Sequence, residues 1–184
     1  MTLDEIIKRF KEINDEGFIE STRPNNKDGG IGNTLEDLLS VKENNNSKAD
    51  LFGYEIKSQR ELTSSYISLF SKSPDYPKVA NSILKEKYGE IRDDSIHKKL
   101  YASLLGGRES LIYHKYYMKL DLDRINKKLF LNSLSIDTNV LYSDVYWKFE
   151  TLRKASHKLN NLIFAQADTK SINNIQYFHY RFNR

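Results

Sequence analysis

Two carboxylates and a lysine stand close together in the stretch Asp50-Leu-Phe-Gly-Tyr-Glu55-Ile-Lys57. Apolar residues separate them in the manner of a half-buried strand, and Gly53 permits a bend. Because side chains alternate between the faces of a strand, Glu55 and Lys57 are expected to share one face. If Asp50 lies on the strand that enters the bend, its carboxylate can approach that of Glu55. Two carboxylates a few ångströms apart suit a hard cation such as Mg²⁺, with the lysine beside it.

The same triplet also occurs as solvated charges on exposed strands, so the pattern alone leaves both interpretations open. A third carboxylate has the same two interpretations. Glu36 lies off the apolar stripe of its predicted helix, which Leu35, Leu38 and Leu39 form. It is either a surface charge or a carboxylate near the other two that reaches the cation through water.

The composition indicates one globular domain. The chain has 184 residues, of which 39% are hydrophobic and 29% charged, enough to build one self-supporting core. Its lack of cysteine excludes disulfides and thiolate-bound zinc, and is consistent with a reducing cytoplasm. The N-terminus lacks the charge pattern of a signal peptide. The net charge of +4 permits a polyanionic partner without requiring one.

Hydrophobic periodicity predicts a mixture of helices and strands. An amphipathic helix is expected over residues 3–14, with Thr2 and Glu5 as a capping box. Further helices are expected over 33–39, capped by Asn33 or Thr34, over 77–87, and from Asp144 to Leu159. Strands are expected over 66–70, 111–122, 127–133, 162–168 and 177–182. The helix before 162–168, together with that almost wholly apolar strand, indicates half of a parallel crossover unit whose strand is buried on both faces.

Basic residues outside the triplet are candidates for contacts with a phosphate backbone. The loop 21–30 carries basic residues beside small polar groups, and a rigid proline-containing connection over 71–77 carries others nearby. The candidates are Arg23, Lys27, Lys72, Lys78 and Arg108. For the loop residues, plain solvation is the alternative interpretation.

Several blocks of sequence occur in a characteristic order, namely Gly29–Leu39, the Asp50…Glu55-x-Lys57 motif, Tyr66–Pro74, Val79–Asn81, Tyr88-Gly89 and Val145–Phe149. Together these blocks resemble the MvaI/BcnI family of restriction endonucleases. The order of elements also resembles the PD-(D/E)XK nuclease core and, more distantly, the MutH nicking endonuclease, in which a helix carboxylate occupies a position like that of Glu36. The resemblance implies an α/β fold with a mixed central sheet flanked by helices, forming a single nuclease domain over residues 1–184.

The resemblance also implies a function, namely Mg²⁺-dependent hydrolysis of duplex DNA at a short site of CC/GG type by a cytoplasmic, monomeric type II restriction endonuclease. Asp50, Glu55 and the carbonyl group of Ile56 would hold the cation, which promotes in-line attack of water on phosphorus. Lys57 would orient or deprotonate that water and share the developing charge, and Glu36 would be an outer ligand.

Members of the family are expected to continue past the position of Arg184 with a segment that helps to build the DNA-recognition side. The chain would then be a fragment, a short relative, or a subunit completed by a partner. The alternative function is therefore a DNA-binding or subunit module that has a nuclease fold but is inactive or non-specific by itself.

Overall fold

The computed structural model describes residues 2–25, 29–40, 51–61, 63, 66–92 and 96–181. The chain forms two compact units, here called unit 1 (Met1–Phe70 with Ser156–Arg184) and unit 2 (Ser71–Ala155). No helix within the described ranges is both long enough and apolar enough to cross a membrane.

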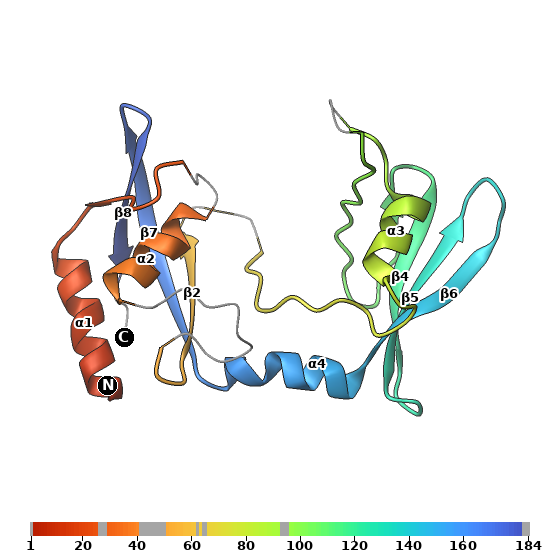
Figure 1. Cartoon of the computed structure of the whole chain (residues 1–184), viewed down its shortest axis with the longest axis horizontal. Helices are drawn as coiled ribbons and strands as arrows, with labels where there is room; N and C mark the ends of the chain where they lie inside the picture. Colours follow the sequence, from red (N-terminus) through yellow and green to blue (C-terminus); the bar gives the residue numbers. More distant parts are fainter. Residues whose placement is uncertain are drawn as a thin grey trace. The chain divides into compact units, whose positions relative to one another are not determined.

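Unit 1 is built on a four-stranded mixed sheet (Figure 1). Its strand order is β1 (Ile19–Glu20), β8 (Ile175–Arg181), β7 (Leu162–Ile172) and β2 (Glu55–Arg60). β2 and β7 are parallel, whereas β8 is antiparallel to both of its neighbours. In the sequence, unit 2 is inserted between β2 and β7, which are neighbouring strands of the sheet in unit 1. This arrangement is compatible with the predicted single nuclease domain, which stays a prediction.

Two helices, α1 (Leu3–Asp15) and α2 (Gly30–Leu38), form the core of unit 1 together with the sheet. The predicted capping box of α1 is confirmed, since Thr2 Oγ1 accepts from the Glu5 nitrogen (3.3 Å) and Glu5 Oε2 accepts from the Thr2 nitrogen (2.6 Å). The small side chains of Ala165 and Ala167 on β7 are buried in the same cluster as Leu35 of α2. They leave room for the helices to approach the sheet closely.

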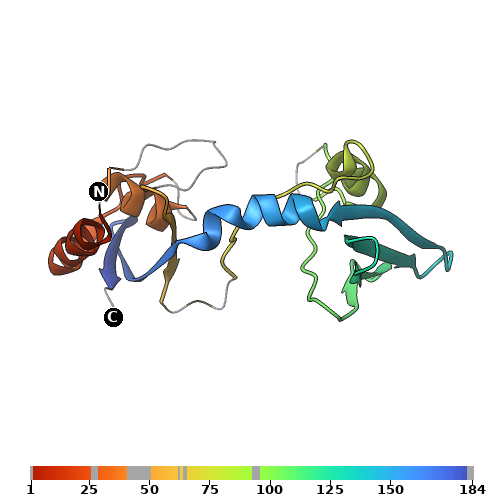
Figure 2. The same ribbon diagram turned by 90° about the horizontal axis from the view of Figure 1, so that it is seen from below.

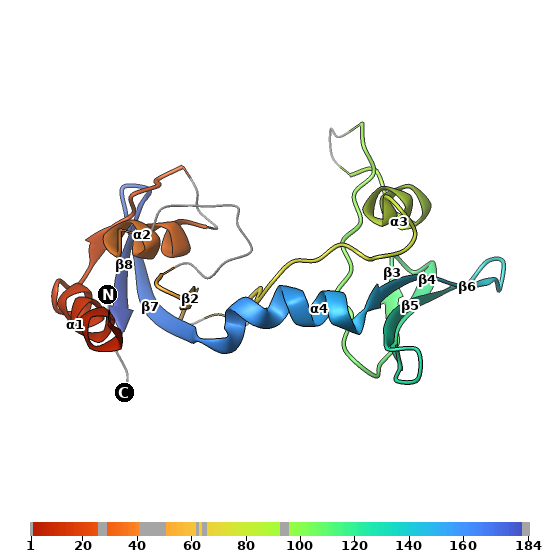
Figure 3. The ribbon, with the colours of Figure 1, turned by 60° about the horizontal axis from the view of Figure 1, so that its bottom comes forward.

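Unit 2 contains an antiparallel sheet in the order β3 (Ser110–Ile112), β4 (Tyr116–Asp123), β5 (Lys128–Ser135) and β6 (Leu141–Lys148). Helix α3 (Ala80–Tyr88) lies against this sheet (Figure 3) and buries Leu84 and Tyr88 on Met118 and Leu131. The hydroxyl groups of Tyr88 and Ser133 share a buried hydrogen bond of 2.5 Å.

The chain leaves unit 2 through helix α4 (Phe149–Ser156) and a short 3₁₀ helix (His157–Asn160), which lead directly into β7 (Figure 2). The predicted crossover from a helix into a parallel strand is thus confirmed. The predicted start of the helix at Asp144 is wrong, because β6 continues to Lys148. Trp147 pairs with Leu129 of β5 and donates a hydrogen bond from Nε1 to the carbonyl oxygen of Lys72 (2.9 Å), which holds this segment extended.

Other expected elements also differ from the structure. Residues 66–70 form no strand, because this apolar run pairs with no strand of the described chain. Tyr66 within it is 84% exposed. The single strand expected over 111–122 turns back at residues 113–115 and becomes the hairpin β3–β4. Helix α2 begins at Gly30 rather than after Asn33, and Thr34 is buried inside it. Strand β7 is buried on one face only, since Leu162 and Phe164 are exposed.

Candidate active site

A tight turn leads into the strand that carries the Glu-x-Lys pair. Leu51 and Tyr54 exchange two backbone hydrogen bonds of 2.8 and 2.9 Å around Phe52 and Gly53. Both central residues have positive φ angles, 48° and 92°, and the second requires the freedom of glycine. The bend predicted at Gly53 is confirmed. The turn delivers the chain to Glu55 at the first position of β2.

Glu55 is fully buried, with an exposed fraction of 0%. Its Oε1 atom accepts a hydrogen bond from Lys57, two residues along β2 on the same face. The same oxygen lies 2.6 Å from Nζ of Lys158, which comes from the 3₁₀ helix before β7. The two lysine side chains are only 22% and 23% exposed. A buried anion is therefore compensated by two largely buried cations.

The lysines keep Glu55 ionised. Burial raises the pKa of the Glu55 carboxyl, but hydrogen bonds from Lys158 and Lys57 and the attraction of both charges outweigh burial and hold this pKa below its ordinary value. Glu55 is thus an anion at neutral pH, with two lysine side chains on one of its oxygens.

The second carboxylate oxygen of Glu55 fits a role as a metal ligand. Oε2 is buried and has no hydrogen-bond partner within the described chain. An unsatisfied buried carboxylate oxygen is costly unless a ligand completes it, and carboxylate oxygens are the donors that Mg²⁺ prefers. Across the described residues, no cluster of three or more acidic or histidine side chains could hold a metal ion. Asp50, the other predicted carboxylate ligand, lies outside the described residues.

The remaining predicted ligands lie near this strand or on the helix that packs against it. Ile56 follows Glu55 directly, and its side chain is buried in the core. Glu36 is half-buried on α2, one turn after Gly32. A Cβ atom at Gly32 would lie 3.6 Å from Oγ of Ser58 on β2, so this face of α2 approaches the strand. A role for the Ile56 carbonyl group or for Glu36 stays a prediction.

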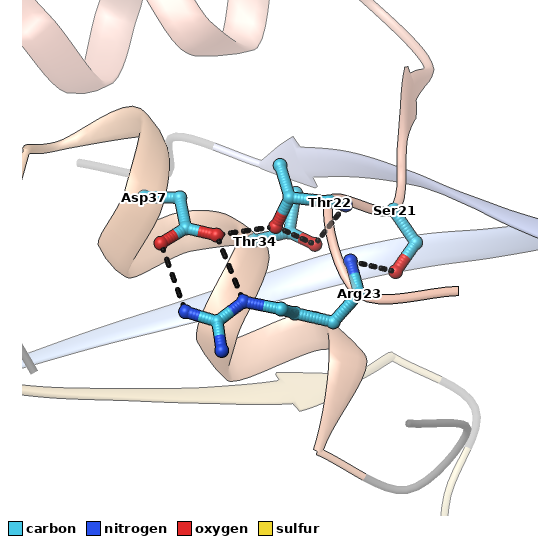
Figure 4. A network of polar contacts seen from close by, with 5 residues as sticks. All are labelled: Ser21, Thr22, Arg23, Thr34 and Asp37. Atoms are coloured by element: carbon cyan, nitrogen blue, oxygen red, sulfur yellow. Dashed lines mark hydrogen bonds and ion pairs between the residues drawn. The ribbon is translucent and has the colours of Figure 1, made fainter. Parts of the chain in front are cut away.

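The predicted phosphate contacts divide between the units. In unit 1, Arg23 pairs with Asp37 through Nε and a terminal nitrogen, both at 3.4 Å (Figure 4). In unit 2, Lys72, Lys78 and Arg108 have exposed side chains. Lys27 lies outside the described residues.

Two residues at the site were not found by sequence reasoning, namely Lys158 and Asn161. The carbonyl oxygen of Asn161 accepts from the Glu55 nitrogen (2.8 Å), and its side-chain Nδ2 donates to the carbonyl oxygen of Gly53 (3.2 Å). The sequence indicates these two residues only indirectly, through strand pairing. If the strand 162–168 is the parallel neighbour of the Glu-x-Lys strand, the residues just before it lie beside Glu55.

The mixed α/β sheet flanked by helices and the buried Glu-x-Lys pair are those of a PD-(D/E)XK-type nuclease fold. The sequence matches the model of the MvaI/BcnI restriction endonuclease family over residues 7–182, and the chain belongs to this family.

Solved structures agree with this assignment. The structure described as the complex of restriction endonuclease MvaI with its cognate DNA substrate matches 98% of this chain and 73% of its own, with 27% identity and a TM-score of 0.86. Restriction endonuclease MvaI in the absence of DNA matches 97% of this chain and 77% of its own, with 28% identity and a TM-score of 0.51. No curated protein sequence matches. The family and these structures place the chain among type II site-specific deoxyribonucleases.

Proposed function

We propose that the chain cuts duplex DNA in a Mg²⁺-dependent reaction at a short site of CC/GG type, using Asp50, Glu55 and Lys57. The observation that carries the proposal is the buried Glu55 carboxylate, whose Oε1 is held by lysines while Oε2 has no partner within the described chain. A similar solved structure is a complex of MvaI with its cognate DNA, which supports duplex DNA as the substrate.

Each residue of the proposed site has a separate role. Asp50 and Glu55, with the carbonyl group of Ile56, would hold the cation, and Glu36 would support it from outside. A bound Mg²⁺ would supply positive charge at the phosphate and increase the acidity of water. Lys57 would donate hydrogen bonds to the attacking water and to the phosphate oxygens, and so stabilise the charge that develops there. Because Lys57 already donates a hydrogen bond to Glu55, we assign it the role of a donor rather than that of a base.

Basic side chains would hold the DNA backbone. Lys72, Lys78 and Arg108 expose their side chains to solvent and are proposed as phosphate contacts. Arg23 and Lys27, from the loop predicted over residues 21–30, are proposed as further contacts. We propose further that the protein acts in the cytoplasm, where its substrate is found, and that it acts as a monomer.

Cleavage of a supercoiled plasmid tests the reaction. The wild-type chain is incubated with plasmid in Mg²⁺ or in EDTA, beside the variants Asp50→Ala and Lys57→Ala. The expected result is linear DNA with wild type in Mg²⁺ alone, and a rate at least about 100-fold lower for each variant. Sequencing of the ends gives the site. Equal activity of all three proteins would reject the assigned residues.

The alternative function is a module that binds DNA without cutting it. It predicts salt-dependent binding of duplex DNA by all three proteins and no cleavage by any of them. The same plasmid experiment, with a binding assay at two salt concentrations, therefore separates the two functions.

A further inference from the structure

Lys158 shares the buried oxygen of Glu55 with the lysine of the motif. Its Nζ atom lies 2.6 Å from Oε1 of Glu55, and Lys57 donates to the same atom. No part of the Glu-x-Lys pattern marks Lys158, because the whole of unit 2 separates the two lysines in the sequence.

The position of Lys158 follows from the strand pairing. Glu55 is the register partner of Leu162 in the parallel pair β2–β7, so the residues that precede each strand meet at the same edge of the sheet. Asn161 fixes this edge through its bonds to the Glu55 nitrogen and to the carbonyl oxygen of Gly53. Lys158 starts three residues before this anchor and is three-quarters buried, so its side chain has few other positions to adopt.

A glutamate carboxylate rotates easily about its last bond, because this torsion is broad. Two donors on Oε1 oppose that rotation, and neither lysine is a hydrogen-bond partner of Oε2. Lys57 alone cannot hold this orientation and also serve the water and phosphate in the proposed reaction. A second lysine on the same oxygen removes the conflict.

We propose that Lys158 is a positioning residue that holds the Glu55 carboxylate through Oε1, so that Oε2 stays available to the cation and Lys57 is free to act on the substrate. The proposal rests on the function proposed above. It assigns Lys158 no contact with the reacting atoms.

The competing explanation is that Lys158 only compensates charge. The two explanations predict opposite changes in cation affinity when Lys158 is replaced. Removal of one positive charge beside a cation site should strengthen cation binding if charge is all that Lys158 supplies. Loss of a residue that orients a metal ligand should weaken cation binding, by about 10–100-fold for groups of this kind.

Isothermal titration of the DNA-free chain with Mn²⁺ alone measures whether cation affinity rises or falls. Single-turnover plasmid cleavage in Mg²⁺ is measured beside it. Lys158→Met keeps the length of the side chain without the ammonium group, and Lys158→Arg keeps charge and reach. Lys154→Met is the matched control, because Lys154 is 74% exposed and pairs with Glu150 at the surface. Lys158→Met should bind Mn²⁺ and cleave DNA about 10–100-fold more weakly. Lys158→Arg should recover most of both, and Lys154→Met should match wild type.

Mn²⁺ binding by Lys158→Met that equals or exceeds wild type would overturn the proposal, as would an unchanged rate of cleavage. If Lys158→Met does not fold, Lys158→Gln, which also removes the positive charge, takes its place: Mn²⁺ binding weaker than that of wild type supports the proposal, and binding equal to or stronger than that of wild type rejects it. Failure of the proposed function has a different result, in which wild type itself neither binds Mn²⁺ in a manner that Asp50→Ala abolishes nor cuts DNA. The role of Lys158 then falls as well.

Discussion

The backbone nitrogen of Glu55 donates a 2.8 Å hydrogen bond to the carbonyl oxygen of Asn161, and so joins the first residue of β2 to the residue that precedes β7. The Asn161 side chain adds a second bond, to the carbonyl oxygen of Gly53 in the turn before Glu55. One residue thus fixes both the turn and the strand that carry the Glu-x-Lys pair. The geometry at Glu55 depends on this contact between segments that are distant in the sequence.

Asn161→Ala should lower the cleavage rate more than it lowers DNA affinity. The variant loses the bond to Gly53 but keeps its own backbone bond to Glu55, so the stability cost should be about 0.5–1.5 kcal/mol. Misplacement of the turn by a fraction of an ångström should reduce single-turnover cleavage by about 10-fold or more. Urea unfolding measures the loss of stability, single-turnover cleavage measures the rate, and duplex binding in Ca²⁺ measures the DNA affinity. Asn14→Ala, at the end of α1, is the control, and equal rates for both variants would contradict the prediction.

Local patterns in the sequence predicted the parts of the fold that local interactions determine. The capping box of Thr2 and Glu5, the bend at Gly53, and the shared face of Glu55 and Lys57 each depend on residues a few positions apart. The order of blocks in the sequence indicates the family without any contact between distant segments.

Contacts between distant segments account for what the sequence did not show. Lys158 reaches Glu55 only because β2 and β7 pair across the inserted unit 2. Trp147 lies in a strand, against its helical periodicity, because β5 supplies a partner for pairing. Residues 66–70 carry the apolar residues of a strand but pair with none in the described chain. Pairing partners, rather than propensity, decide these cases.

A polar network around Asp37 should give unit 1 a pH-dependent stability (Figure 4). Hydrogen bonds from Thr22 (2.5 Å) and Arg23 lower the pKa of Asp37 below its ordinary 3.8, against the opposing effect of burial. A carboxyl group with a lowered pKa stabilises the folded state above its unfolded pKa, and this contribution is lost as the pH falls through the folded pKa. Asp37→Asn should therefore be less stable than wild type at pH 5–8, by up to about 1 kcal/mol.

The difference between Asp37→Asn and wild type should shrink below about pH 4 and vanish in stronger acid. Thermal unfolding of both proteins from pH 2 to pH 8 measures it. A stability difference that stays constant down to pH 2 would exclude an ionic contribution of Asp37 and leave only a change in packing.

Gly89 should tolerate no side chain. A Cβ atom there would lie 2.4 Å from the carbonyl oxygen of Lys85 and 3.1 Å from that of Lys99, and backbone atoms cannot move aside as a flexible side chain can. Gly89→Ala should thus destabilise unit 2 by about 1–3 kcal/mol through displacement of the end of α3. Gly106→Ala is the matched control, because a Cβ atom at Gly106 meets nothing within 4 Å. Chemical denaturation should show a lower midpoint for Gly89→Ala only.

Salt dependence of DNA binding should separate the exposed basic residues from Arg23. Each side chain that neutralises a phosphate releases counterions, so its loss should lower the slope of log affinity against log salt by about 0.9. Lys72→Ala, Lys78→Ala and Arg108→Ala should each show this decrease with duplex DNA in Ca²⁺, because these side chains are exposed.

Arg23 is paired with Asp37 at 3.4 Å, and DNA must compete with that carboxylate for it. Arg23→Ala should therefore change the slope by less than half as much. A full decrease for Arg23→Ala would mean that Arg23 leaves Asp37 when DNA binds, and unchanged slopes for the other three would remove them from the interface.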